Sequence, residues 1–268
     1  MTYDYDRTAA RPIPVDKPAL AKLAKQLVTE LPKHLKFRPD DMDQRLSWCR
    51  QFRPNWGFQL GVYETTDVKG GYVGVPVRVK WANMEDWNPT RQWIAGGGVL
   101  TRHFERGGVG SKLEMYVKIN AARTPNEMLT HLDRIEKEAF SVLIHETTHL
   151  RDLLKGVDAY QEAEEGEGKD ALYYNSPREV RAFMQQIADE VIEFVEKEAK
   201  VLGVGTWGIA LNGRTLDRAL DMSITWDRVR KSMAPANLKL VIKGVERALR
   251  DEWPRLEKLY PAEDINDE

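Results

Sequence analysis

The hydrophobic pattern of this chain changes period once, and that change limits the fold more than any other feature. In residues 56–120 apolar side chains alternate with polar ones, most clearly at Leu113, Met115, Val117 and Ile119. From Thr124 onward apolar side chains recur three and four positions apart. Alternation is typical of strands that bury one face, and the longer spacing is typical of amphipathic helices. The sequence therefore predicts an α+β fold, in which a twisted, mostly antiparallel sheet precedes a helical C-terminal half.

The ends of these elements follow from turn and capping residues. Gly70 and Gly71 separate two alternating segments and predict a hairpin. Thr124 and Glu127 have the spacing of a capping box at a helix start, and Pro32 predicts the end of the first helix. The predicted strands are residues 59–66, 72–81, 93–104 and 112–119. The predicted helices are residues 17–31, 40–52, 124–155 (as one helix or two), 176–201 and 238–253.

These patterns divide the chain into three parts. Residues 1–54 form an N-terminal arm with helices, residues 55–201 form the core, and residues 202–268 form a helical C-terminal part. We expect the last part to pack on the core, so that the chain makes one compact unit.

The composition of the chain limits the classes of partner that we expect for the protein. The 268 residues have a formal net charge of −2, without the excess of positive charge typical of nucleic-acid-binding proteins. The N-terminal residues are acidic, unlike a signal peptide, and no apolar run approaches the length of a membrane span. Cys49 is the single cysteine, which excludes an intrachain disulfide and a cysteine-rich metal site. We expect a cytoplasmic protein without nucleic-acid or membrane partners.

The chemistry of the chain centres on His145-Glu146-Thr147-Thr148-His149, an H-E-x-x-H motif in a predicted helix. Residues four apart lie one turn apart on the same helix face, so the two imidazoles can bind one metal ion. Glu146 lies about 100° further round the helix, where its carboxylate can reach a water on that metal. Zinc lowers the pKa of such a water toward about 7, and the carboxylate can take its proton. The simplest alternative is a helix with two structural histidines.

The third metal ligand has more than one interpretation. A catalytic zinc ion usually has three protein ligands. The metzincin subclass has a histidine six residues after the second one, but Lys155 stands there, and Asp152 replaces its glycine. Glu179 is the candidate, thirty residues after His149, although its spacing from Ser176 also fits a capping box. Asp152 is the competing ligand, or it orients a histidine by accepting its second N–H.

The motif helix, the loop after it and Asn175-Ser176-Pro177-Arg178-Glu179-Val180-Arg181-Ala182 resemble the gluzincin type of zinc metallopeptidases. Over roughly residues 111–190, the chain is most similar to small metallopeptidases of bacteria and phages, which also suggests a phage-encoded protein. The resemblance implies a zincin-like catalytic core and one zinc ion per chain. It implies His145, His149 and Glu179 as metal ligands and Glu146 as the general base. It further implies a peptide substrate lying along residues 112–119 as an edge strand.

Three more residues are candidates for stabilising an oxyanion, because a phenol or a guanidinium can face developing negative charge: Tyr173, Tyr174 and Arg181. Each also has an ordinary interpretation as a packing or surface residue.

Two functions compete with peptide hydrolysis. One is a zincin-fold protein that has a binding or structural role without catalytic turnover, for example in a phage particle. The other is a zinc hydrolase of a non-peptide amide.

Overall fold

The computed structural model describes residues 15–35, 57–66, 70–82, 93–102, 112–120, 123–154, 173–202 and 213–261. These residues fall into two compact units, within Val15–Asp158 and Ala159–Glu268. The division lies inside the segment 55–201 that the sequence pattern treats as one core. The predicted helix at residues 40–52 lies outside the described residues. No helix in the described part of the chain is both long and apolar enough to cross a membrane.

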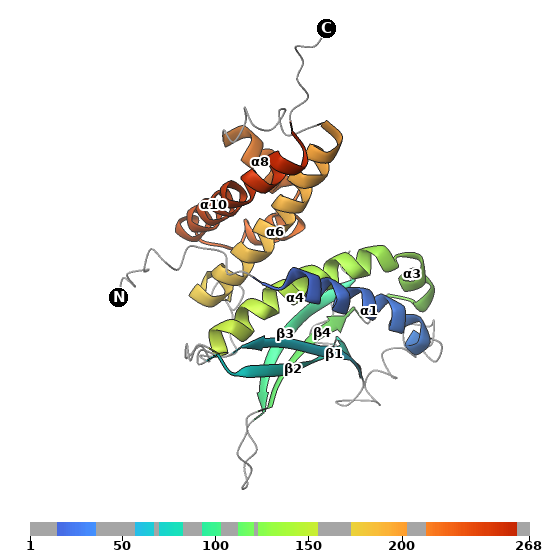
Figure 1. The fold of residues 1–268 in the computed structure, drawn as a ribbon. Helices are drawn as coiled ribbons and strands as arrows, with labels where there is room; N and C mark the ends of the chain where they lie inside the picture. The colour runs from blue at the N-terminus through green and yellow to red at the C-terminus, as the bar shows by residue number, and fades with distance from the viewer. Residues whose placement is uncertain are drawn as a thin grey trace. The chain divides into compact units, whose positions relative to one another are not determined.

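The first unit contains a mixed four-stranded sheet together with helices, which confirms the predicted α+β class (Figure 1). The strands are β1 Gly57–Thr66, β2 Tyr72–Trp81, β3 Ile94–Arg102 and β4 Lys112–Ile119. Their order in the sheet is β1-β2-β4-β3. β1 pairs with β2 and β3 pairs with β4 in antiparallel fashion, whereas β2 and β4 are parallel. Gly70, with a φ of 79°, supplies a left-handed residue in the predicted β1–β2 hairpin.

The strand order corrects the expectation that residues 112–119 form an edge strand. β4 is an inner strand, because it pairs with β2 on one side and with β3 on the other. Its backbone groups therefore bond within the sheet, and β3 holds the edge position on that side. The alternating pattern predicts which segments are strands and which side chains face the core. It does not encode which distant segments become neighbours, so the edge could not be assigned from it.

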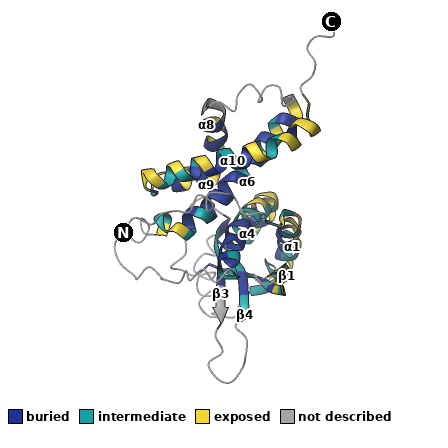
Figure 2. Ribbon diagram, turned by 60° about the vertical axis from the view of Figure 1, so that its left-hand side comes forward, coloured by how far each residue is buried: buried dark blue, intermediate teal, exposed yellow. Residues whose placement is uncertain are grey.

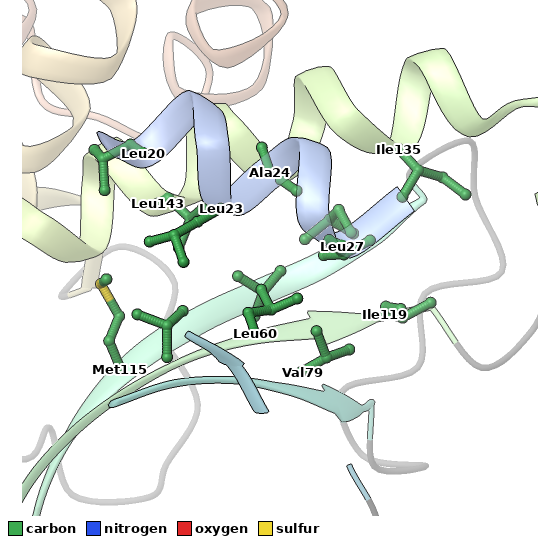
Figure 3. Close-up of a cluster of buried hydrophobic side chains, with 14 of the residues drawn as sticks. Leu20, Leu23, Ala24, Leu27, Leu60, Val79, Met115, Ile119, Ile135 and Leu143 are labelled. Carbon is green, nitrogen blue, oxygen red and sulfur yellow. The ribbon is translucent and has the colours of Figure 1, made fainter. Parts of the chain in front are cut away.

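One face of this sheet is apolar, and the helices α1 Lys17–Leu35 and α4 Leu132–Leu154 cover it (Figures 1 and 3). Alternate residues of the two inner strands are buried on this face: Val75, Val77, Val79, Met115, Val117 and Ile119. Leu27 of α1 and Leu143 of α4 are fully buried in the same cluster. Full burial of such a side chain contributes about 1.5–3 kcal/mol, so this packing fixes α4 on the sheet.

One observed helix end agrees with its prediction from the sequence, and another differs from its prediction. The capping box is confirmed: Glu127 N–H donates to Thr124 Oγ1 at 3.1 Å, and Thr124 N–H donates to Glu127 Oε2 at 2.8 Å. The helical segment after it is two helices, α3 Pro125–Thr130 and α4. The predicted end of the first helix is wrong, because α1 continues through Pro32 to Leu35. Leu35 is buried in the core, and that burial offsets the backbone hydrogen bond that proline cannot make.

The second unit is helical. It contains α6 Pro177–Leu202, α8 Gly213–Asp221, α9 Ile224–Val229 and α10 Pro235–Leu259. Helices α6 and α10 carry the predicted segments 176–201 and 238–253, and each has a buried side and an exposed side (Figure 2). Gly244 of α10 lies so close to Met184 of α6 that a β-carbon would collide with the thioether. The two helices therefore pack with almost no space between them at this point.

Candidate metal centre

Helix α4 carries a run of buried polar residues. Apolar residues before and after the motif hold the helix in the core, and Ile135, Ala139, Leu143 and Leu150 are fully buried. The motif between them is also buried, with His145 at 6% exposure and His149 at 4%. Burying polar side chains is costly unless each has a hydrogen-bond or ligand partner. A buried H-E-x-x-H segment therefore needs a chemical reason beyond packing.

The two threonines of the motif have such partners within the core. Thr148 Oγ1 donates to the carbonyl of Ile144 at 3.2 Å, one turn earlier in the same helix. Thr147 Oγ1 lies 3.8 Å from the sulfur of Met115 on β4. The contact with Met115 orients this part of α4 over the sheet, and the chemistry of the motif is left to His145, Glu146 and His149.

The two histidines converge through their Nε2 atoms, which lie 3.0 Å apart. Their rings are nearly perpendicular, with centroids 4.7 Å apart and an interplanar angle of 84°. Zinc–nitrogen bonds of about 2.0–2.1 Å in a tetrahedral site place two ligand nitrogens roughly 3.3 Å apart. The observed pair is close to that spacing, so both imidazoles fit one metal ion. A hydrogen bond between two neutral imidazoles would use the same geometry, with one nitrogen donating and the other accepting.

Glu146 lies directly against the edge strand β3. A β-carbon built at Gly97 would lie 2.7 Å from Glu146 Cγ and 2.9 Å from its Oε1, closer than side chains approach in practice. The glutamate is 6% exposed, so it is buried between α4 and the backbone of β3. The sequence identifies Glu146 from its motif but gives no sign of this contact. At the glycines of residues 96–98 the sequence pattern predicts only a strand.

The candidate third ligand, Glu179, lies in the first turn of α6 in the helical unit. Its backbone N–H donates to Ser176 Oγ at 3.3 Å, which is one half of a capping box. The other half would use the amide of Ser176, but that amide donates to the carbonyl of Tyr173 at 3.2 Å. The serine therefore caps α6, while the amide that a capping glutamate would engage has a backbone acceptor.

The remaining predicted site residues divide between the two units. Asp152 lies on α4, less than one turn after His149, and is 1% exposed. Tyr173 and Tyr174 belong to the helical unit and form an aromatic cluster with Phe183, with ring centroids 5.2–6.0 Å apart. Arg181 lies in the second turn of α6 and is partly buried. The oxyanion role of the two tyrosines and Arg181 stays a prediction.

Two further histidines have ring partners of their own. His34 stacks on Phe58 at 4.0 Å, and His131 packs against Trp93 at 4.8 Å. Both contacts are typical of histidines that pack against aromatic neighbours. The fifth histidine, His103, lies outside the described residues.

A carboxylate that the sequence gives no reason to select, Glu138, joins α4 to the start of β3. Its Oε2 accepts the backbone N–H groups of Trp93 at 2.6 Å and Ile94 at 2.9 Å. Burial raises the pKa of Glu138 above its ordinary value of 4.5, and the two amide hydrogen bonds oppose that shift only in part. Glu138 thus anchors the strand that lies over Glu146.

The raised pKa of Glu138 makes a prediction about pH. The folded protein holds this proton more tightly than the unfolded chain, so the contribution to stability is complete below pH 4.5 and is lost as the pH rises through the folded-state pKa. Glu138→Gln removes this titration. Measured by urea unfolding from pH 4 upward, the variant should become more stable relative to wild type as the pH rises. Parallel curves for the two proteins would contradict the assignment.

No family model, curated protein or solved structure matches the chain. The motif, its geometry and the sequence resemblance are therefore the observations that bear on function.

Proposed function

We propose that this protein is a zinc-dependent metallopeptidase with a zincin-like core, in which His145 and His149 bind the metal and Glu146 acts as general base. The observation that carries the proposal is the buried histidine pair, whose Nε2 atoms converge to 3.0 Å with a buried glutamate next in the chain to His145. Two imidazoles one helical turn apart supply two of the three protein ligands of a hydrolytic zinc site, and the carboxylate beside them can act as its base. A pair of purely structural histidines would not require the glutamate.

Glu179 is the third ligand in this proposal. His145, His149 and Glu179 are described residues that together could supply three metal ligands, two imidazole nitrogens and one carboxylate oxygen. Nitrogen and oxygen ligands at zinc distances of 2.0–2.2 Å lie roughly 3.3–3.6 Å apart in a tetrahedral site, so a bound ion would draw the three side chains together. The proposal thus includes an approach of the first turn of α6 to the histidine pair, and the metal-binding experiment in the Discussion tests it.

The metal ion and Glu146 have separate roles in the proposed hydrolysis. A bound zinc ion would supply Lewis acidity, polarising the substrate carbonyl and lowering the pKa of a water toward about 7. Glu146 then accepts the proton of that water as the oxygen attacks the carbonyl carbon, and later donates it to the nitrogen of the leaving amine. The contact with β3 holds this carboxylate in one place, and the burial of the site keeps bulk water away from it.

The substrate in this proposal is an extended peptide that lies along β3 instead of β4. Among the described strands, β3 pairs with β4 alone and occupies the edge of the sheet beside α4. An edge strand can pair with an extended backbone through its outward N–H and C=O groups.

Metal-dependent cleavage of a mixed peptide library, followed by mass spectrometry, tests the proposed function. Wild-type protein should cleave a subset of peptides, lose that activity after treatment with a chelator and regain it when one equivalent of zinc is added. Cleavage that persists without metal would contradict a metallopeptidase. Zinc binding without cleavage of any peptide would favour the two competing functions, a zincin-fold binding protein or a hydrolase of another amide.

A further inference from the structure

The glycine run in β3 contains two residues that lack side chains for different reasons. Neighbouring residues in a strand face opposite sides of the sheet. Gly97 faces α4, where a β-carbon would lie 2.7 Å from both Glu146 Cγ and Val142 Cγ1. Gly98 faces the other side, where a β-carbon would collide with the phenol ring of Tyr116. Only the first of these contacts involves the general base of the proposed function.

The strand cannot move away from α4 to relieve a clash at Gly97. Glu138, on the same helix, accepts the N–H groups of Trp93 and Ile94 at 2.6 and 2.9 Å. On its other side the strand is held by the ladder to β4, in which Gly97 lies opposite Val117. A methyl group at position 97 would therefore displace the flexible side chain, and that side chain is the carboxylate of Glu146.

We propose that Gly97 is a positioning residue for Glu146: the missing side chain at position 97 determines where the carboxylate of the general base lies. This inference rests on the proposed function for its catalytic consequence but on packing alone for the contact. A misplacement of about 1 Å in a reacting group can cost on the order of a hundredfold in rate. Gly97→Ala should therefore lower turnover although it adds one methyl group and removes no polar atom.

The contact is tested first without metal or substrate, by a double-mutant cycle in urea unfolding. Gly97→Ala and Glu146→Ala are made singly and together, and unfolding is measured with chelator present. Glu146→Ala removes the two glutamate atoms, Cγ and Oε1, that the new methyl group would meet, so Gly97→Ala should destabilise the protein less in that background than in wild type. An equal cost in both backgrounds would overturn the inference, whatever the protein's activity.

Turnover is tested second, with Gly74→Ala on β2 as the control, because a β-carbon there would lie 3.1 Å from Val62 Cγ1 and meet no residue of the proposed site. Gly97→Ala should keep the zinc content of wild type and lower kcat about a hundredfold, with a much smaller change in KM. Gly74→Ala should keep kcat within a few-fold of wild type. Equal losses of kcat in both variants would show a general effect of an added methyl group in the sheet and overturn the inference.

Val142 provides the last control, because its methyl group is the other atom that the new side chain would meet. In a Val142→Ala background, the methyl group of Gly97→Ala meets only Glu146. The Val142→Ala change also relieves crowding if Gly97→Ala alone does not fold. The loss of kcat relative to Val142→Ala should persist. Recovery of kcat would assign the effect to Val142 and overturn the inference. Absence of hydrolysis in wild type would refute the proposed function instead, while the unfolding cycle still decides the contact.

Discussion

Glu146→Gln is expected to lower kcat for peptide hydrolysis about 10²–10⁴-fold while zinc stays bound at about one ion per chain. Glutamine keeps the length of the side chain and its packing against Gly97, but its amide cannot accept the proton of an attacking water. The metal is retained because residue 146 lies about 100° round the helix from His145 and is therefore not on the face that the two histidines share. The measurements are steady-state kinetics and metal content by mass spectrometry on the same preparation.

The matched control is Asp133→Asn, the same change of acid to amide at an exposed position in the first turn of α4. It should leave both kcat and zinc content unchanged, because Asp133 lies three turns before the motif. Hydrolysis by Glu146→Gln at the wild-type rate would show that this carboxylate is not the base. Loss of zinc would instead make Glu146 a ligand and require a different base.

The local parts of the fold were accessible to sequence reasoning because local physics determines them. The alternation in residues 112–119 predicts β4 with its observed bounds, and the spacing of Thr124 and Glu127 predicts a capping box that forms with both hydrogen bonds. The H-E-x-x-H spacing predicts two histidines on one helix face, and their Nε2 atoms do converge. Each of these features depends on residues fewer than ten positions apart.

The features that the sequence did not reveal depend on distant segments. The inner position of β4 follows from its parallel pairing with β2, some forty residues away in the chain. The extension of α1 past Pro32 depends on the burial of Leu35 in the core. The contact of Gly97 with Glu146 joins residues nearly fifty positions apart. Propensity and period describe one segment at a time, so they carry no information on such pairs.

Glu179→Gln is expected to reduce bound zinc from about one ion per chain to a small fraction of that in protein purified without added metal. A neutral amide oxygen is a much weaker zinc ligand than a carboxylate, and two histidines alone leave the ion with half of a tetrahedral set. Glutamine is chosen over alanine because it can still serve in a capping box. A loss of metal in this variant therefore reports on the ligand and not on the start of α6.

The capping interpretation of Glu179 makes a different prediction for the same protein. If the carboxylate only stabilises the start of the helix, Glu179→Ala should lower the free energy of unfolding by about 0.3–1 kcal/mol in chelator and leave zinc binding intact. The ligand interpretation expects little change in chelator and a loss of the stabilisation that added zinc gives to wild type. Urea unfolding with and without zinc distinguishes the two.

Two acids provide the comparison for Glu179. Glu193→Gln is the control, because Glu193 lies on the same helix in an exposed ion pair with Lys197 at 2.6 Å and should not affect zinc. Asp152 is the competing ligand, buried at 1% exposure and close to His149 on α4. Zinc retained by Glu179→Gln but lost by Asp152→Asn would place the third ligand on the histidine helix itself. The metal would then be bound by one unit alone, and the proposed approach of α6 would no longer be required.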